Sequence, residues 1–233
     1  MKSAIKVIGV MVLLLVALFL FTACDKNDGP TGDVIVNDEC SEFEESAKDD
    51  CYLDNIQCSK ISNELVRDNC VLELAKLKHN FEVCNLIKNE QVGAHCQETV
   101  AEVVNEVSLC ELINNSYWKN NCFYNLAINN NNESPCGNIF GNGDQRNRCY
   151  HNIATSTNNY LICTYLIGVE KEKCFLEVVK ETLNTEICKE FNTVLGQDSC
   201  YFKIAKLADN EEYCDLISFD VIKEDCQKVF TEK

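Results

Sequence analysis

The sequence predicts an all-α protein: a solenoid of about eight disulfide-stapled α-hairpin repeats of about 26 residues each. Three observations predict this fold. Cysteines recur at nearly constant spacing, apolar residues recur with them at helical spacing, and patterns typical of β-strands are nearly absent. The chain has 233 residues, of which 46% are hydrophobic and 25% are charged. This composition is too apolar for a disordered chain.

The first 23 residues have the layout of an export signal. Lys2 and Lys6 supply a positive start, residues 7–21 are uncharged and mostly apolar, and the small residues Thr22 and Ala23 follow. We therefore expect the rest of the chain to lie outside the cytoplasm, in the periplasm or on the cell surface.

The residues before Cys24 suggest how the protein is anchored. Phe21-Thr22-Ala23-Cys24 resembles the lipobox of prokaryotic membrane lipoproteins, with Phe21 in place of the usual Leu. The resemblance implies cleavage before Cys24 and a diacylglycerol on its sulfur, which would attach the protein to the membrane. Two alternatives stay open. One is an uncleaved signal anchor, for which residues 7–23 are just long enough to cross a hydrocarbon core of about 30 Å. The other is a cleaved secretory signal.

Residues 24–38 are predicted to be a lipid anchor and flexible tether, and residues 39–233 a repeat domain. The tether contains Gly29, Pro30 and Gly32 and has no helical period. The full chain has a formal net charge of −16, and loss of the two lysines of the signal would make the mature protein more acidic still. Because phosphate recognition needs a basic surface, we expect no nucleic-acid partner.

The sixteen cysteines after Cys24 divide the chain into repeats. From Cys58 onward their spacings alternate between about 12 and about 14 residues, a combined period near 26 that is typical of repeat architectures. The predicted repeats begin at Cys40, Cys58, Cys84, Cys110, Cys136, Cys163, Cys188 and Cys214. Their second cysteines are Cys51, Cys70, Cys96, Cys122, Cys149, Cys174, Cys200 and Cys226.

A short helix is predicted around the first cysteine of each repeat. The residue three positions later is apolar in every repeat, which places the two side chains on one helix face. Four positions before the cysteine, Asn or Asp is usual, and these residues cap helix N-termini. The apolar residues are Phe43, Ile61, Ile87, Ile113, Ile139, Leu166, Phe191 and Ile217. From Cys58 onward, the predicted caps are Asp54, Asn80, Asn132, Asn159, Asn184 and Asn210, with Glu106 as the exception.

A second helix is predicted around the second cysteine. Aromatic residues often follow that cysteine directly, and an apolar residue and an alanine often stand four and five positions after it, as in Leu126-Ala127 and Ile153-Ala154. These positions form a broad buried stripe. The hairpins resemble helix-hairpin repeats of the tetratricopeptide class in organisation, but the repeat is shorter and lacks that class's Trp-Leu-Gly-Tyr signature.

Disulfide geometry favours pairing within each repeat. A continuous helix across 12 residues would separate the two cysteines by about 18 Å, whereas a disulfide needs Cα atoms within about 7 Å, so a turn must bring them together. Pairing between repeats would leave Cys40 and Cys226 without partners. The predicted pairs are Cys40–Cys51, Cys58–Cys70, Cys84–Cys96, Cys110–Cys122, Cys136–Cys149, Cys163–Cys174, Cys188–Cys200 and Cys214–Cys226.

The sequence offers little catalytic chemistry. Its three histidines, His79, His95 and His151, belong to no Cys-x-x-Cys or His-x-x-x-His pair, so we expect no metal and no cofactor. No phosphate loop or nucleophile motif is present, and we do not expect an enzyme. Asn114 and Asn132 stand in glycosylation sequons, which matter only in an organism that glycosylates.

Two classes of function remain. The first is a membrane-anchored scaffold that binds a protein or peptide partner, as stacked hairpins often do. The alternative is a structural or protective protein of the cell envelope without a specific ligand. An exposed apolar stripe along one face would favour binding, and a uniformly charged surface would favour the structural role. The middle repeats are the most irregular, with Trp118, the asparagine run 129–132 and a loop at Gly141, so we expect any site there.

Overall fold

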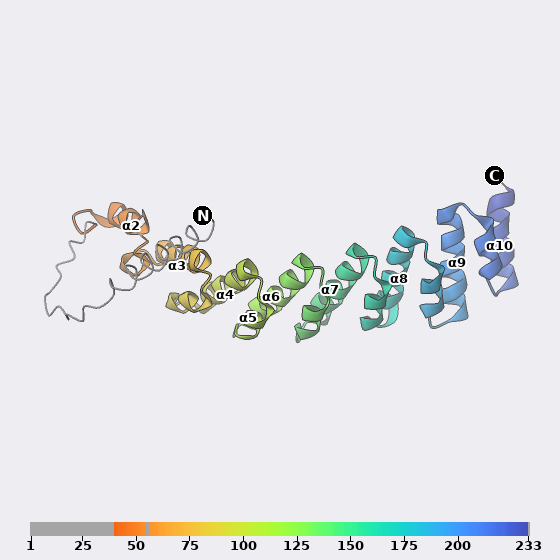
Figure 1. Ribbon diagram of the computed structural model, residues 1–233, viewed down its shortest axis with the longest axis horizontal. Coiled ribbons are helices and arrows are strands. Elements are labelled where there is room, and N and C mark those ends of the chain that lie inside the picture. The colour runs from red at the N-terminus through yellow and green to blue at the C-terminus, as the bar shows by residue number, and fades with distance from the viewer. Residues whose placement is uncertain (1–39, 55, 233) are drawn as a thin grey trace, which may run out of the picture. The chain divides into compact units, whose positions relative to one another are not determined.

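The computed structural model describes residues 40–54 and 56–232, and all regular structure in these residues is helical. Residues 43–232 belong to one compact unit (Figure 1). Its α-helices are α2 (Glu45–Asp54), α3 (Glu64–Lys78), α4 (Glu90–Val104), α5 (Val107–Glu111), α6 (Ser116–Asn129), α7 (Gly143–Ser156), α8 (Gly168–Thr182), α9 (Val194–Ala208) and α10 (Asp220–Thr231). Its 3-10 helices are η1 (Cys58–Lys60), η2 (Phe81–Leu86), η3 (Ser134–Asn138), η4 (Tyr160–Tyr165), η5 (Thr185–Glu190) and η6 (Glu211–Leu216).

From Cys58 onward, each repeat is a hairpin of a short helix and a longer α-helix, which confirms the predicted solenoid of helical hairpins. The short arm differs in detail from an α-helix. It is a 3-10 helix in six of these repeats and the five-residue α5 in the repeat that begins at Cys110. The reason is length, because an arm of three to six residues has room for i to i+3 bonds but forms few α-helical ones.

Most of the predicted caps of the short arms are present. The side chains of Asn80, Asn159, Asn184 and Asn210 each accept a hydrogen bond from the amide two residues later, at 2.9–3.2 Å. The carboxylate of Glu106, which breaks the asparagine pattern, accepts the equivalent bond from Ser108 at 3.4 Å. Glutamate therefore fills the same role in that repeat. Two predicted caps are wrong. Asp54 lies inside α2, and Asn132 stands one residue before Glu133, which is the N-cap of η3.

The long arms keep a fixed register to their cysteines. Each of α3, α4, α6, α7, α8, α9 and α10 begins six residues before its cysteine. The spacing of 13 between Cys136 and Cys149 and of 11 between Cys163 and Cys174 is therefore absorbed by the loop between the two arms. This result explains why the spacing within repeats varies while the spacing between repeats does not.

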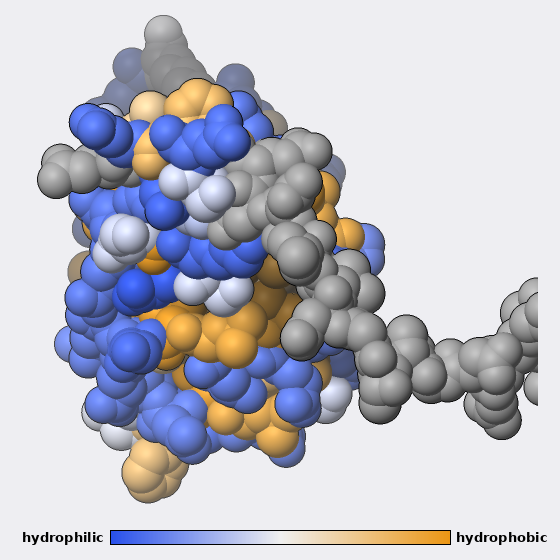
Figure 2. Space-filling model, turned by 90° about the vertical axis from the view of Figure 1, so that its left-hand side faces the viewer, coloured by the Kyte–Doolittle hydropathy of each residue, from blue (hydrophilic) through white to orange (hydrophobic). Residues whose placement is uncertain are grey.

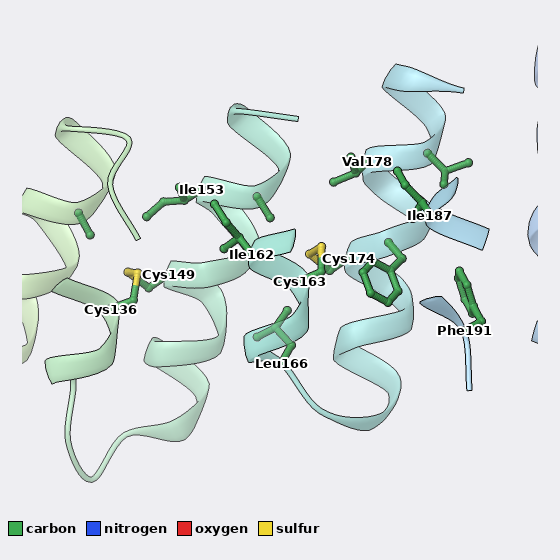
Figure 3. Close-up of a cluster of buried hydrophobic side chains, with 14 of the residues drawn as sticks. Cys136, Cys149, Ile153, Ile162, Cys163, Leu166, Cys174, Val178, Ile187 and Phe191 are labelled. Atoms are coloured by element: carbon green, nitrogen blue, oxygen red, sulfur yellow. A yellow bond between two sulfur atoms is a disulfide. The ribbon is translucent and has the colours of Figure 1, made fainter. Parts of the chain in front are cut away.

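Seven disulfides have the predicted pairing within one repeat, from Cys58–Cys70 to Cys214–Cys226, with Cα–Cα distances of 5.4–5.7 Å. Cys40 and Cys51 are also disulfide-bonded. All of these cysteines except Cys51 are buried. Figure 3 shows two of the disulfides between the arms of their hairpins.

Apolar side chains fill the space between successive repeats. Ile153 of α7 packs toward Ile162 of η4, and Val178 of α8 packs toward Ile187 of η5 (Figure 3). Each long arm thus contacts the short arm of the next repeat. The residues predicted three positions after the first cysteine are at most 7% exposed from Ile61 onward, but Phe43 is 51% exposed. The prediction fails there because residues 41–44 form a turn and a bend, so no helix face is present.

Buried polar side chains tie a long arm to the loop of the next repeat. Asp49 accepts hydrogen bonds from the amides of Ser62 and Asn63, at 2.7 and 2.9 Å. These amide bonds hold the pKa of Asp49 below its usual value. Asp198, which is completely buried, binds the amides of Ser218 and Phe219 in the same way, at 2.8 and 2.9 Å. Asn120 holds the next loop through both the amide and the carbonyl of Phe140. All three stand two residues before a second cysteine.

Candidate functional site

Exposed apolar residues recur in or beside the loops that join the two arms of each hairpin. These loops lie at one edge of the stack, as the two loops in Figure 3 illustrate. We call the series the loop-edge surface. It consists of Leu65, Leu86, Leu112, Tyr117, Phe140, Tyr165, Ile167, Val169, Val194, Leu195, Leu216, Phe219 and Val221. Every repeat from Cys58 to the C-terminus contributes at least one of them.

Helix geometry places these side chains outside the core. Because the second cysteine points inward, a residue five positions earlier on the same helix is rotated by about 140° from it. Leu65, Tyr117 and Val169 occupy that position and are 63–77% exposed. The residue two positions after the first cysteine, such as Leu112, also projects outward from its short arm. The same packing that buries the cysteines therefore exposes these residues.

Some of these apolar residues replace helix caps. The side chains of Asn63, Asn89 and Asn115 each accept amide bonds at the start of their long arm. Phe219 has nearly the same backbone angles, with φ −82° and ψ 117°, but caps α10 with no side-chain hydrogen bond and is 50% exposed. Ile167 precedes α8 without a side-chain cap and is 82% exposed. An exposed apolar residue at a cap position lowers stability, which points to selection for another property.

The loop-edge residues are most numerous in the C-terminal repeats. Figure 2 looks at the opposite, N-terminal side of the stack, where patches of hydrophobic surface also interrupt the mostly hydrophilic surface. Segments 138–144, 165–170, 190–195 and 216–221 contain nine of the thirteen loop-edge residues. The same segments contain four acidic residues, Asp144, Glu170, Glu190 and Asp220, and no lysine or arginine.

Of the residues expected to mark a site, Trp118 lies in a polar cluster between α4 and α6. Its ring packs against that of His95, with centroids 4.5 Å apart and the two planes tilted by 33°, and its buried Nε1 has no hydrogen-bond partner. Glu98, which is 5% exposed, lies 3.1 Å from Nδ1 of His95 and accepts from Asn125 at 3.2 Å. Burial raises the pKa of Glu98, and the nearby charge of Glu102 raises it further. The cluster connects two repeats.

The asparagine run 129–132 has a local structural role. Asn130 donates to Asn105 at 2.6 Å, Asn131 accepts from Ser156 at 3.3 Å, and Asn132 accepts from the amide of Ser134 at 3.1 Å. The loop at Gly141 is different. There, Gly141 takes a φ of +69°, and the preceding Phe140 is 87% exposed. This loop belongs to the loop-edge surface.

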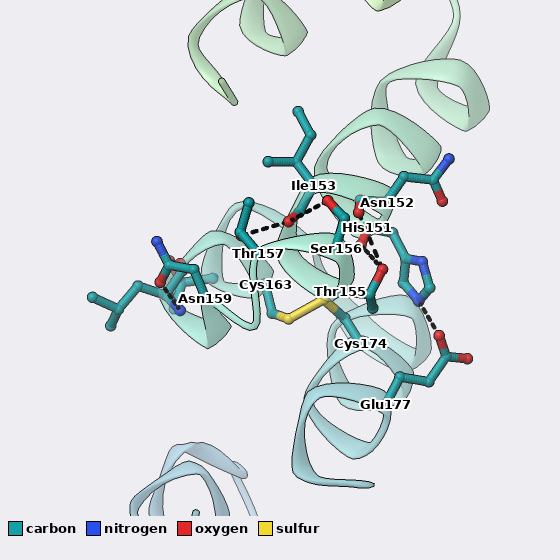
Figure 4. Close-up of a disulfide and its surroundings, with 12 residues drawn as sticks. His151, Asn152, Ile153, Thr155, Ser156, Thr157, Asn159, Cys163, Cys174 and Glu177 are labelled. Atoms are coloured by element: carbon teal, nitrogen blue, oxygen red, sulfur yellow. Dashed lines mark hydrogen bonds and ion pairs between the residues drawn. A yellow bond between two sulfur atoms is a disulfide. The ribbon is translucent and has the colours of Figure 1, made fainter. Parts of the chain in front are cut away.

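The groove between α7 and α8 has mixed charge. An open hollow of about 290 Å³ there is lined by Asp144, Asn147, Arg148, His151, Glu170 and Lys173. A second hollow of about 510 Å³ lies toward the C-terminal ends of these helices. Between them, Nε2 of His151 lies 3.2 Å from Oε2 of Glu177, a distance that suits an ion pair when the ring is protonated (Figure 4). Opposite charges balance along this groove, so it has no evident selectivity.

The other predicted site residues fall into three groups. The sixteen cysteines of the repeats form disulfides. His79 ends α3 in a left-handed conformation, and among the described residues no three His, Cys, Asp or Glu side chains are grouped to hold a metal ion. Cys24, the signal and the tether lie outside the described residues. Within the described part of the chain, no helix has both the length and the apolar character needed to cross a bilayer.

Comparisons with known proteins give no relative to which a function could be transferred. No family model, no curated protein and no solved structure matches the chain. The function must therefore be argued from the surface itself. The irregularities of the sequence pointed to Trp118 and Gly141 but not to the loop-edge surface. The signal was available, because apolar residues recur two positions after the first cysteine and five before the second.

Proposed function

We propose that the protein is a membrane-anchored extracytoplasmic lipoprotein whose α-solenoid binds a protein or peptide partner along the loop-edge surface. The observation that carries this proposal is the series of thirteen exposed apolar residues on one edge. Contiguous exposed apolar surface is uncommon on soluble proteins and is typical of interaction sites. A structural protein without a ligand has no need for it.

The features of the N-terminal sequence and the disulfides support the location. Disulfides persist in oxidising compartments and are rare in the cytosol, and this chain has at least seven of them. Residues 1–23 have the pattern of an export signal, and Cys24 follows a lipobox-like sequence. A lipid on Cys24 with the following tether would hold the repeats outside the membrane.

The test is partner capture from the native envelope with two matched variants. The full chain is cross-linked in its own cells and then isolated, either unchanged or with Ile167 and Val169 both replaced by serine. The control replaces Leu77 and Val103 by serine, two exposed apolar residues on the helices away from the loops. Surface substitutions of this kind change stability by about 0.5 kcal/mol or less, so all three proteins should fold.

We expect the Ile167/Val169 variant to lose a partner that both the unchanged protein and the Leu77/Val103 variant retain. If both variants retain the same partners, the loop-edge surface does not bind them. If no partner is captured by any of the three, the structural role in the envelope becomes the better explanation.

A further inference from the structure

We propose that the hollow beside Ala94 binds a carboxylate group through the backbone amides of Asn114 and Asn115. The ligand is either a small free carboxylate or a carboxylate of a peptide. This inference does not depend on binding along the loop-edge surface. Three observations lead to it: equivalent amides bind carboxylates elsewhere in the chain, the loop before α6 has the same backbone angles, and a hollow lies beside it.

Pairs of successive backbone amides bind a carboxylate at two other places in the stack. The carboxylate of Asp198 accepts hydrogen bonds from the amides of Ser218 and Phe219, 20 and 21 residues later in the chain, at 2.8 and 2.9 Å. Asp49 binds the two amides directly before α3, at 2.7 and 2.9 Å. These amide bonds hold the pKa of Asp49 below its usual value. The amide pair therefore favours the ionised form of a carboxylate.

The equivalent residue in the repeat of Cys84 and Cys96 is Ala94. Like Asp49 and Asp198, it stands two residues before the second cysteine of its repeat, and the residues 20 and 21 positions later are Asn114 and Asn115. The methyl group of alanine accepts no hydrogen bond. Among the described residues, neither of these two amides donates to another atom. They precede α6 and are distinct from the first amides of the helix, which the side chain of Asn115 caps.

The loop before α6 has the backbone angles of the two loops that bind a carboxylate. The residue that ends the loop has φ −71° and ψ 117° at Asn63, φ −82° and ψ 117° at Phe219, and φ −73° and ψ 117° at Asn115. Ile167 and Thr193, whose amides form no such bond within the described chain, have φ of −127° and −125°. The amide pair before α6 therefore has the orientation that binds a carboxylate.

A fourth loop has these angles, with φ −73° and ψ 114° at Asn89. The residue at the corresponding position of the preceding long arm is Asp68, which is 4% exposed. It pairs with Arg67, at 3.7 Å between Nε and Oδ1, and not with the amides. Of the four described loops with this conformation, three thus follow an aspartate, and the loop before α6 follows an alanine.

A hollow of about 190 Å³ lies at this position. Its lining includes Gly93, Ala94, Gln97, Asn114 and Asn115. Ala94 is 5% exposed, whereas Asn114 is exposed, so the hollow extends from the buried side of α4 to the surface. It has room for a carboxylate with a few further atoms, and a ligand can reach it from solvent.

The charges near the hollow resemble those at the two occupied sites. Of the described residues that line it, only Glu90 is charged, and that residue is exposed. At the occupied sites an acidic residue directly follows the two amides, Glu64 at one and Asp220 at the other, and the carboxylate is bound nevertheless. Ser116 stands at that position before the hollow. One nearby acidic residue therefore does not prevent binding.

The probe is acetate, added to the full chain in detergent micelles with isotope-labelled asparagine. A free ligand lacks the covalent link that holds Asp198 in place, so the method must detect weak complexes. NMR follows the amide signals of Asn114 and Asn115. Asn63 is the internal control, because Asp49 already binds its amide. We expect acetate to shift the first two signals to saturation and to leave the third unchanged. Acetamide at equal ionic strength should act far more weakly, because a neutral acceptor forms weaker hydrogen bonds.

Two matched variants locate the site. Ala94→Asp supplies a carboxylate from the chain itself, as Asp198 does, and should weaken acetate binding by about tenfold or more, because it competes for hydrogen bonds to a charged group. The control, Val103→Asp, adds the same charge to α4 at an exposed position outside the hollow. It should weaken binding by about twofold or less, because exposed charges are screened.

Two N-acetylated tripeptides distinguish the sources of the carboxylate. One has a free C-terminus, and the other has an amidated C-terminus and a glutamate side chain. Tighter binding of the first than of acetate assigns the site to a peptide C-terminus, and tighter binding of the second assigns it to an acidic side chain. If neither peptide binds more tightly than acetate, the ligand is a small free carboxylate.

Three results would overturn the inference: no saturable shift of the Asn114 and Asn115 signals in the unchanged protein, an equal shift with acetamide, or an undiminished shift in the Ala94→Asp variant. An equal shift of the Asn63 signal would also contradict it, because acetate would then act as a general salt. The outcome leaves the proposed binding along the loop-edge surface to its own test.

Discussion

Replacing Cys110 and Cys122 together by alanine removes one disulfide from the middle of the stack and should weaken that repeat alone. The cross-link closes a segment with a sequence separation of 12, and restricting the unfolded chain over such a segment contributes about 3 kcal/mol. Both cysteines are completely buried, so the lost sulfur contacts add to this. The repeats on either side oppose the loss, because the stacked helices remain in contact.

Hydrogen exchange of the full chain, read by mass spectrometry, resolves the effect along the sequence. A local loss of about 3 kcal/mol corresponds to exchange roughly 100-fold faster in α5 and α6, while α9 and α10 should be unchanged. Replacing Cys214 and Cys226, which have the same separation of 12, should have a larger effect on α10, since that repeat has only one neighbouring repeat in the described chain. Equal acceleration from α3 to α10 in either variant would refute the idea that repeats are coupled only to their neighbours.

Three further outcomes are expected. Phe219→Asn should be more stable than Phe219→Ala by about 1 kcal/mol in thermal unfolding, because both lose the ring but only asparagine can cap α10; equal stability would contradict this. Burial raises the pKa of Glu98, because it favours the protonated carboxyl in the folded protein. The stability that this protonated group contributes is present below about pH 4.5 and is lost as the pH rises through the raised pKa. Glu98→Gln should therefore be more stable than the unchanged protein at pH 7, and denaturant unfolding should show this gain vanishing towards pH 4.5. Mass spectrometry of the mature N-terminus should find a lipidated Cys24, and recovery of residues 1–23 would exclude the lipoprotein.

The repeat architecture could be predicted because cysteine spacing and helical periodicity constrain the same residues. Ile113 and Leu126 are buried because each lies at a helical interval from a cysteine that must reach its partner. The disulfide pairing could be predicted for two reasons. Only pairing within repeats leaves no repeat cysteine without a partner, and a disulfide can bridge only a short distance. These constraints act within one hairpin, so a single sequence contains them fully.

The 3-10 geometry of the short arms and the exposure of Phe43 could not be predicted in this way. The 3-10 geometry depends on how few residues the short arm contains. The exposure of Phe43 depends on whether a helix forms at residues 41–44 at all. The loop-edge surface was missed for a different reason. Core positions such as Ile139 and exposed ones such as Phe140 are adjacent apolar residues in the sequence, and only the turn between the arms sends them in opposite directions.

The central claim is that partners bind along the loop-edge surface of the intact, membrane-attached protein. Site-specific photo-cross-linking in the native envelope tests it most directly, with a photoreactive residue at Ile167 in one protein and at Leu77 in another, both of them exposed apolar positions. We predict a discrete cross-linked product from position 167 and none from position 77. A product from position 77 alone, or the same products from both positions, would contradict the claim.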